Sequence, residues 1–416
     1  MRFCFVSPEY VTEPSFSGGL ANYLGRITVA LAERGHEVHV LTRSTENGTL
    51  DYRGVTVHRV VPLWDKRMIL DHIDPFVPRV FYNVYQDLKA AWCLWRRWKT
   101  LARKAKFDLV QVANVSACGL FFKGEKRVPV ITRLSSYRPV WDKAAGIPET
   151  KGVRARWVME ERAIKGTRWI YAPTRYVADL AEKNYGVSVQ VVETPFFSEE
   201  PHPDNSLYNQ IGVGKSYALF FGRMTQMKGV HILAQALPAV LRALPDLQMI
   251  FVGPDASAPD GKPMSEWILA HLERADPDGT EKLKERVTLV GATRHDQLYP
   301  LIENAHLVVL PSLMDNLPNT CLEAMGAGRV VVATSGSCFE ALIDDRESGF
   351  LVAPGEVEAL AQSLIEAWQF APDAREAMGQ LARARIEKLH PDRAVPELLR
   401  FFEGVQNEFA GRPKTS

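Results

Sequence analysis

Short apolar runs alternate with longer segments whose apolar residues recur at helical spacing. Residues 2–7 and 38–42 are apolar runs of the length expected for buried parallel strands. Between them, residues 20–34 show the spacing of an amphipathic helix, which begins after Gly18-Gly19. Strand, glycine turn, helix and strand form a βαβ unit. The pattern therefore predicts an α/β protein built on parallel sheets.

The same alternation starts again in the second half of the chain. Residues 198–216 are rich in Pro, Asp, Glu, Asn and Gly and lack periodicity, so we predict an interdomain linker there. Another strand is expected at 218–221. We therefore predict two doubly wound parallel-sheet domains, one over residues 1–200 and one over residues 201–390.

Composition excludes several classes of protein. The 416 residues are 46% hydrophobic and 24% charged with a formal net charge of +1, which gives no reason to expect a nucleic-acid partner. The N-terminus has no signal-peptide apolar region, and no run of about 18 apolar residues predicts a membrane span. Five cysteines without a C-x-x-C pair indicate reduced thiols. We expect a cytoplasmic protein.

The stretch PSLMDNLPNTCLEAMGAG, residues 311–328, follows an apolar run that ends at residue 310. Asp315 falls in its loop and Glu323 in the helix that follows. Open α/β sheets bind ligands outside the carboxyl ends of their strands, which favours a binding site here. The alternative is structural, because Thr320 and Glu323 have the spacing of a capping box.

A second candidate stretch is FFGRMTQMKGVHIL, residues 220–233. It places Arg223 and Lys228 beside glycines at a predicted strand end. An arginine fork and a lysine point charge suit a diphosphate, although such a pair is also common on ordinary surfaces.

These motifs together resemble the retaining family 4 glycosyltransferases. Asp315-x7-Glu323 is similar to the E-x7-E signature of that family, in the variant DNLPNT, and Gly222 to Gly229 is similar to its G-R-x4-K-G motif. GGLANYLGRITVALAERGHEVHVLT matches the glycine loop of the family. The resemblance implies a GT-B fold, two Rossmann-like domains facing a cleft, with a final helix in 391–416 that packs back on the first domain.

The resemblance also implies roles for individual residues. Arg223, Lys228 and Asp315 would be catalytic, and Glu323 would hold the ribose hydroxyls. The residues expected to line the donor site are Gly18, Gly19, Gly222, Gly291, Asn316, Leu317, Thr320 and Glu323. The implied reaction retains the anomeric configuration, with the acceptor attacking from the leaving-group face, and needs no protein nucleophile, metal or cofactor.

Two positions depart from the family pattern. Arg133-Leu134-Ser135-Ser136 stands where the family often has a histidine that meets the transferred sugar, and aspartate replaces glutamate at position 315. A third acid near the motif, Glu340, has no assigned role. A D-x-D sequence occurs at 276–278, but its proline and the glycine that follows favour a turn over a metal site.

Residues 85–106 combine tryptophans at helical spacing with many lysines and arginines. This pattern suits either a packed helix with solvated cations or peripheral contact with the inner face of a membrane.

The expected activity is sugar transfer in polysaccharide or glycoconjugate biosynthesis, from a UDP-sugar in preference to a GDP-sugar, onto a glycan, lipid-linked or small-molecule acceptor. The alternatives are an epimerase or phosphorylase of the same architecture, or a non-catalytic sugar-nucleotide-binding protein.

Overall fold

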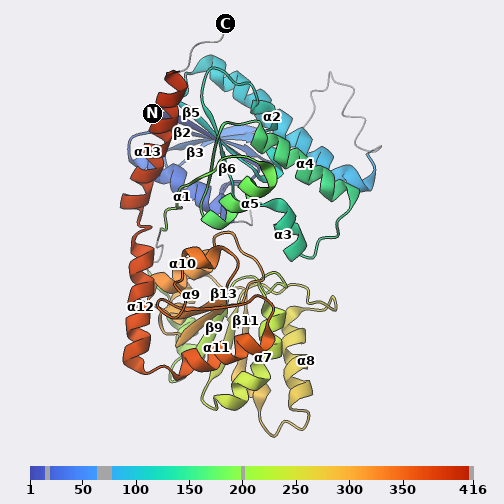
Figure 1. Cartoon of the computed structure of the whole chain (residues 1–416), viewed down its shortest axis with the longest axis vertical. Coiled ribbons are helices and arrows are strands. Elements are labelled where there is room, and N and C mark those ends of the chain that lie inside the picture. Colours follow the sequence, from blue (N-terminus) through green and yellow to red (C-terminus); the bar gives the residue numbers. More distant parts are fainter. Residues whose placement is uncertain (15–18, 63–76, 198–201, 412–416) are drawn as a thin grey trace. The chain divides into compact units, whose positions relative to one another are not determined.

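The computed structural model describes residues 1–14, 19–62, 77–197 and 202–411 (Figure 1). The chain forms two compact units. Unit 1 comprises residues 1–143, 147–195 and 391–416, and unit 2 comprises residues 144–146 and 196–390. The chain passes from the first unit to the second at Pro195–Phe196 and returns at His390–Pro391, so the C-terminal helix belongs to unit 1.

Unit 1 holds an eight-stranded sheet in the order β3-β4-β2-β1-β5-β6-β7-β8. All neighbouring strands are parallel except β3 and β4, which form an antiparallel pair. The strands are β1 Arg2–Ser7, β2 Glu37–Arg43, β3 Gly48–Tyr52, β4 Val55–Val60, β5 Leu109–Ala113, β6 Val130–Arg133, β7 Trp169–Ala172 and β8 Gln190–Val191. The helices are α1 Gly19–Glu33, α2 Tyr82–Lys104, α3 Arg138–Ala144, α4 Lys151–Lys165, α5 Arg175–Tyr185 and α13 Pro391–Ala410.

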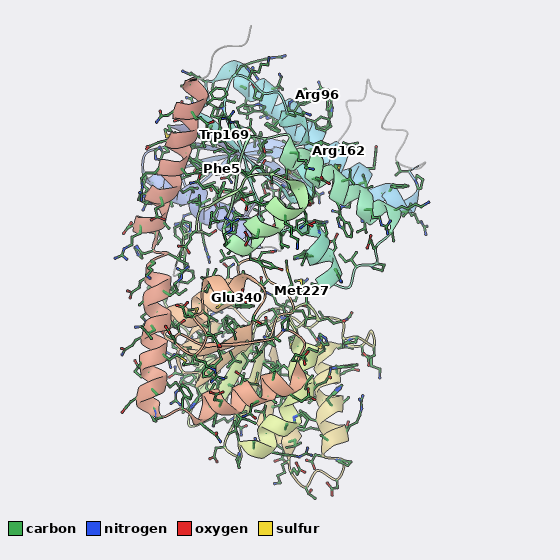
Figure 2. The ribbon with its side chains drawn as sticks, in the orientation of Figure 1. Phe5, Arg96, Arg162, Trp169, Met227 and Glu340 are labelled. Atoms are coloured by element: carbon green, nitrogen blue, oxygen red, sulfur yellow. The ribbon has the colours of Figure 1, made fainter. Side chains whose placement is uncertain are left out.

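Helices cover the sheet of unit 1. Successive side chains of a strand point to opposite faces of the sheet, so apolar residues on both faces need helices to bury them. On β1, Cys4 and Val6 pack in one cluster with the fully buried Trp98 of α2. Phe3 points the other way and contacts Phe402 of α13, with ring centroids 5.6 Å apart. Figure 2 shows Phe5 inside the sheet and Arg96 on the outer side of α2.

Unit 2 holds a six-stranded parallel sheet in the order β11-β10-β9-β12-β13-β14. Its strands are β9 Tyr217–Phe221, β10 Gln248–Val252, β11 Val287–Gly291, β12 Leu307–Leu310, β13 Val331–Thr334 and β14 Phe350–Val352. Its helices are α6 Ser206–Ile211, α7 Val230–Ala243, α8 Met264–Ala275, α9 His295–Glu303, α10 Asn319–Gly326, α11 Val357–Gln369 and α12 Pro372–Glu387.

The core of unit 2 consists of two apolar layers, one on each face of the sheet. Phe220 and Val309 pack with residues of α7, α8 and α11, whereas Phe221 and Leu310 pack with residues of α9, α10 and α12. Neighbouring residues of one strand therefore pack in opposite layers of the core. A strand buried on both faces needs apolar residues at every position, which is why these strands are continuous apolar runs in the sequence.

One prediction about local structure was wrong, and one structural alternative does not occur. Residues 198–216 are not a structureless linker, because α6 lies within them and its Leu207 and Ile211 pack against the core of unit 2. The capping box at Thr320 and Glu323 does not form. Helix α10 begins at Asn319 after Pro318, and its N-cap makes no side-chain hydrogen bond.

Candidate functional site

The predicted donor residues follow β9 and β12, the two strands at which the strand order of unit 2 reverses. These strands are paired in parallel, with Leu219 opposite Val308. From β9 the chain builds the sheet outward through β10 and β11, then starts the other half at β12. The loops that leave β9 and β12 at their carboxyl ends are therefore neighbours at the topological switch point, where open α/β sheets bind ligands.

Glycines end the three strands on one side of this point. A Cβ at Gly253, after β10, would lie 1.9 Å from the carbonyl oxygen of Gly222, after β9. The amide of Gly253 donates to the carbonyl of Gly291, at the end of β11, at 2.7 Å. All three glycines have positive φ. Only glycine permits backbones to approach this closely, so the strand ends form one packed backbone surface.

The two candidate loops are in direct contact. A Cβ at Gly229 would lie 1.8 Å from the carbonyl oxygen of Pro311, and the amide of Leu313 donates to the carbonyl of Met227 at 2.8 Å. Figure 2 labels Met227 in the loop after β9. This packing fixes the position of the lysine in one loop relative to the aspartate in the other.

Lys228 and Asp315 form an ion pair, in which Lys228 Nζ donates to Asp315 Oδ2. Their side chains are only 23% and 15% exposed. Asp315 Oδ1 accepts from the amide of Asn316 at 3.0 Å, which orients the carboxylate. Arg223 is exposed in the same loop as Lys228. The structure thus places a cation and a carboxylate side by side at the switch point.

Helix α10 brings the remaining predicted donor residues to the same place. Thr320 Cγ2 lies 3.5 Å from the position that a Cβ of Gly222 would occupy. Glu323 is one turn further along, with Oε2 3.6 Å from Nε2 of His295 at the start of α9. Its carboxylate is 13% exposed. His295 and Gly253 are site neighbours that the sequence interpretation overlooked, since neither carried a motif of its own.

Other residues near these loops have structural roles. Leu317 packs against the core of unit 2. Glu340, labelled in Figure 2, accepts from the amide of Gly336 at 2.7 Å and so closes the turn after β13. Burial raises the pKa of the Cys321 and Cys338 thiols, with the Asp315 carboxylate as a further cause. These thiols are therefore protonated and unreactive at neutral pH.

The D-x-D sequence forms a turn. The Asp276 carboxylate accepts from the amides of Glu281 and Leu283, and that of Asp278 accepts from the hydroxyl of Thr280 at 3.1 Å. These carboxylates are used to hold the backbone, as the proline and glycine of this segment predicted.

In unit 1, Gly18 lies outside the described residues, and Gly19 is the first residue of α1. The position of the family histidine is occupied by a hydrogen-bonded loop. Asn114, after β5, accepts from the amide of Ser135 at 2.8 Å and donates to the carbonyl of Ser136 at 2.9 Å. Arg133 Nη1 donates to Ser135 Oγ at 2.7 Å.

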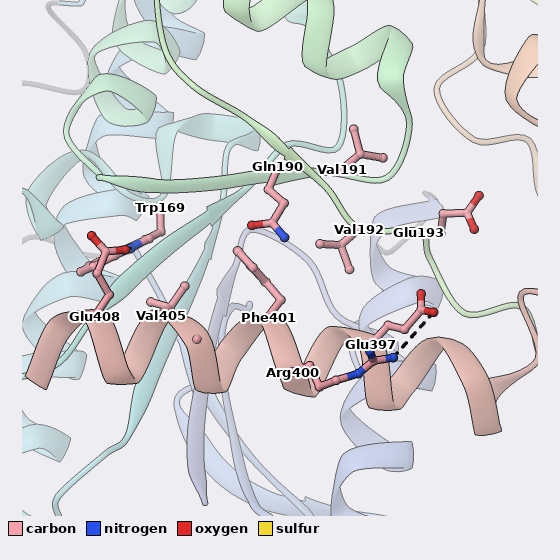
Figure 3. Close-up of a pocket in the computed structure, with 11 residues that line it drawn as sticks. Trp169, Gln190, Val191, Val192, Glu193, Glu397, Arg400, Phe401, Val405 and Glu408 are labelled. Carbon is pink, nitrogen blue, oxygen red and sulfur yellow. Dashed lines mark hydrogen bonds and ion pairs between the residues drawn. The ribbon is translucent and has the colours of Figure 1, made fainter.

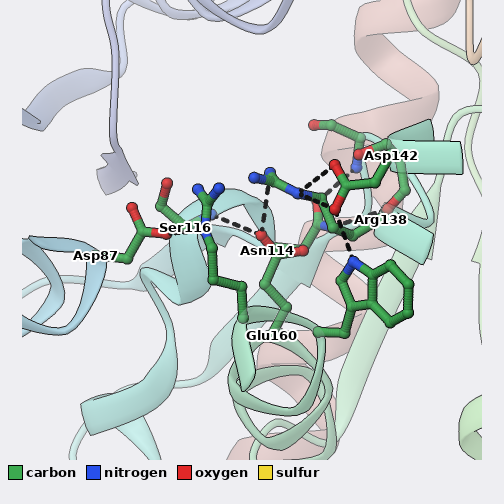
Figure 4. Close-up of polar contacts among 10 residues, drawn as sticks. Asp87, Asn114, Ser116, Arg138, Asp142 and Glu160 are labelled. Carbon is green, nitrogen blue, oxygen red and sulfur yellow. Dashed lines mark hydrogen bonds and ion pairs between the residues drawn. The ribbon is translucent and has the colours of Figure 1, made fainter. Parts of the chain in front are cut away.

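A buried ionic network connects α3, α4 and the turn at Ser116 (Figure 4). The amide of Ser116, which has a left-handed φ of 55°, donates to Glu160 Oε1 at 3.0 Å. Arg138 joins Glu160, at 3.4 Å, to Asp142, at 3.1 Å. Burial raises the pKa of Glu160 to about 7, opposed by Arg138. The network fixes α3 and α4 beside the strand ends.

A cavity of about 470 Å³ lies elsewhere in unit 1, between β8 and α13 (Figure 3). Trp169 and Phe401 form part of its wall, and Glu193, Glu397 and Glu408 also line it. Its one arginine, Arg400, is 3.8 Å from Glu397. A lining in which carboxylates outnumber the single cation does not suit a diphosphate.

Comparison with known proteins identifies the family. The family model described as Glycosyltransferase Family 4 matches residues 17–195, and the model described as Glycosyl transferases group 1 matches residues 215–369. A curated D-inositol 3-phosphate glycosyltransferase of Paenarthrobacter aurescens is 24% identical over 388 residues, which cover 89% of each chain. Spore coat protein SA of Bacillus subtilis is 24% identical over 406 residues, covering 93% of this chain and 95% of the relative.

Solved structures agree in fold. Sucrose-phosphate synthase from Thermosynechococcus elongatus superposes with a TM-score of 0.74 at 17% identity, covering 98% of this chain and 99% of that one. Anabaena HepE in complex with UDP gives a TM-score of 0.67 at 18% identity, covering 97% and 100%. The epimerase, phosphorylase and binding-protein alternatives are not favoured by these matches. The chain belongs to the retaining glycosyltransferases of family 4, enzymes of GT-B fold that use nucleotide-sugar donors.

Proposed function

We propose that this enzyme binds a UDP-sugar at the switch point of unit 2 and transfers the sugar, with retention, to a hydroxyl of a glycan, lipid-linked or small-molecule acceptor. The observation that carries the proposal is the contact between Lys228 and Asp315, which lie 87 positions apart in sequence. The HepE structures in complex with UDP and with UDP-glucose support the choice of base.

Lys228 and Arg223 would stabilise the departing diphosphate. Cleavage of the glycosidic bond concentrates negative charge on that group, and fixed positive charges nearby lower the barrier. The N-terminus of α10 adds the positive end of a helix dipole. Two cations and a helix end make a divalent metal unnecessary on this proposal.

Asp315 and Glu323 would orient the donor. Asp315 accepts a hydrogen bond from Lys228 and so holds the ammonium group in place. Because Asp315 lies beside the proposed diphosphate site, it could also accept a hydrogen bond from a hydroxyl of the transferred sugar. Glu323 would accept hydrogen bonds from the two ribose hydroxyls, a task for an acceptor-only carboxylate. The buried Asn316 Oδ1, which has no hydrogen-bond partner among the described residues, would accept a further donor hydroxyl.

The test is a calorimetric titration with UDP, GDP and their glucose conjugates, combined with donor turnover. UDP should bind at least tenfold more tightly than GDP. Glu323→Gln should weaken UDP binding by about tenfold with little change in kcat, since ribose contacts are equal in the ground and transition states. The control is Glu303→Gln, an exposed carboxylate on α9. Equal affinity of wild type and Glu323→Gln for UDP would refute the ribose assignment.

Contact with a membrane surface through residues 85–106 is also part of the proposal. No helix within the described ranges is long and apolar enough to cross a bilayer. The tryptophans of α2 face inward, because Trp98 is fully buried and Trp92 and Trp95 pack on Phe121.

Exposed cations of this segment, which include Arg96, Arg103, Lys104 and Lys106, would make an electrostatic contact with anionic lipid. Such binding should weaken strongly with salt. Co-sedimentation with phosphatidylserine vesicles at low and high salt tests it, and absence of binding at low salt would exclude it.

A further inference from the structure

Arg133 is the last residue of β6, at the carboxyl edge of the unit 1 sheet, and only 5% of it is exposed. Its Nη1 donates to Ser135 Oγ at 2.7 Å, and its Nη2 donates to Thr194 Oγ1 at 3.2 Å. The guanidinium carbon lies 3.7 Å from the ring centroid of Tyr23, in α1. The Nε atom is buried and has no hydrogen-bond partner among the described residues.

Other poorly exposed arginines of unit 1 face carboxylates. Arg59 is paired with the buried Glu13, Arg156 with Asp87, and Arg138 with two buried acids. Arg133 is more buried than these, yet within the described ranges it forms no ion pair. Its contacts are instead hydroxyl groups and an aromatic face.

A guanidinium held out of water without a counter-charge destabilises a fold, and Arg remains charged at any physiological pH. Such a group is retained where a ligand supplies the missing charge. The planar fork of N–H donors matches a phosphate or a carboxylate. The edge at which Arg133 stands is where ligands of open α/β sheets bind.

We propose that Arg133 binds an anionic group, a phosphate or a carboxylate, carried by the acceptor. The assignment to the acceptor rests on the proposed function, in which the donor diphosphate is served by Lys228 and Arg223 of unit 2. Arg133, in unit 1, then selects charged acceptors over neutral ones. Ser135, held by Arg133 Nη1 and by Asn114, completes the binding edge.

Three variants separate this role from a structural one. Arg133→Met keeps the length of the side chain and removes its charge, and Arg133→Lys keeps the charge without the fork. The control is Arg127→Met, which changes an arginine of the same unit that is 48% exposed and paired with Glu125. Melting temperatures are measured at saturating UDP with one of three anions: inorganic phosphate, glucose 6-phosphate or glucuronate. Each is compared, at equal ionic strength, with chloride as the reference anion or with glucose as the neutral sugar.

The wild-type enzyme and Arg127→Met should be stabilised by at least one anion and not by glucose. Arg133→Met should melt no lower than wild type in chloride, and its apparent Kd for the anion should rise roughly 10- to 100-fold. The apparent Kd of Arg133→Lys for the anion should lie between those of wild type and Arg133→Met. A lower melting temperature of Arg133→Met in chloride with an unchanged anion response, or no stabilisation of wild type by any of the three anions, would overturn the proposal.

The source of the anion is settled by a second titration. If Arg133→Met weakens binding of UDP-glucuronate relative to UDP-glucose and leaves the free anions unaffected, the charged group belongs to the donor and the acceptor assignment is wrong. Titration with UDP alone reports separately on the donor site. A failure of UDP to bind would refute the proposed function, while the anion response of Arg133 remains measurable without nucleotide.

Discussion

Replacing Lys228 with alanine should do more than remove a cation, because Asp315 would lose its partner. In the ion pair the carboxylate is neutralised at the place proposed for the diphosphate. In Lys228→Ala that carboxylate, 15% exposed, faces the anionic ligand without compensation. The two effects act in the same direction, so donor affinity and rate should both fall.

The magnitudes can be estimated. Loss of one preorganised positive group next to a developing negative charge costs roughly 3–4 kcal/mol in the barrier, a fall of about 10²- to 10³-fold in kcat. A carboxylate about 6 Å from a phosphate charge is repelled by about 3 kcal/mol at an effective dielectric constant near 20. Partial exposure and salt reduce this, and we expect about 1–2 kcal/mol. The repulsion from Asp315 should therefore weaken the binding of UDP to Lys228→Ala by about a further tenfold, beyond the effect of losing the cation.

The double variant Lys228→Ala/Asp315→Asn isolates this second effect. Neutralising Asp315 should restore UDP affinity by about tenfold over Lys228→Ala, although kcat stays low. The assay is calorimetric titration with UDP, together with donor turnover. Lys284→Ala is the control, since it breaks an exposed ion pair with Glu273 on the surface of unit 2. If the double variant binds UDP no better than Lys228→Ala, Asp315 does not face the anionic ligand and the proposed site geometry is wrong.

Four further outcomes are expected. Gly253→Ala should lower the free energy of unfolding by about 3 kcal/mol or more, because its Cβ would lie 1.9 Å from a carbonyl oxygen; Gly261→Ala, also at positive φ but in open space, should cost clearly less in the same denaturant titration. Burial, with His39 and Arg97 as lesser causes, lowers the pKa of His58 to about 4. The contribution of His58 to stability should therefore be constant above pH about 6.5 and fall by about 3 kcal/mol as the pH drops to about 4, so the difference in the free energy of unfolding between wild type and His58→Gln should change by that amount. Trp98→Ala should cost about 3–5 kcal/mol, measured in the same way, since the fully buried ring leaves a cavity; an effect below 1 kcal/mol would contradict the packing. Turnover should continue in excess chelator, and a complete loss restored by manganese would show that a metal is required.

The sequence was sufficient to predict the elements that bury continuous apolar runs. Strands such as β9 and β12 must be apolar on both faces, and that requirement is visible in any single stretch of chain. Helix α6 was missed because it has only six residues, too few for a helical period to emerge from a polar segment. The supposed capping box failed because Pro318, not Thr320, precedes the helix, so both of its members fall inside α10.

The candidate site was predictable as a set of residues but not as a set of contacts. The motifs predicted Arg223, Lys228 and Asp315 in loops that follow strands and Glu323 in a helix, which is where they lie in the structure. It could not show that Lys228 is paired with Asp315, because the strand order that makes their loops neighbours is a property of the whole sheet. The contacts of Arg133 come from three different segments of the chain, and no local sequence pattern shows that a counter-ion is missing.

The docking of α13 on unit 1 has a consequence for biosynthesis. Phe402 is fully buried and contacts Phe3 and Tyr171, so the core that contains the first strand is completed by residues translated after unit 2. Domains that are continuous in sequence can fold as they emerge from the ribosome, N-terminal first. Here the order is reversed. Unit 2 can fold while unit 1 still lacks α13 and has an apolar face uncovered. Ribosome stalling or premature termination after residue 390 should thus release a chain whose later-made unit is finished and whose first-made unit is a target for chaperones and proteases.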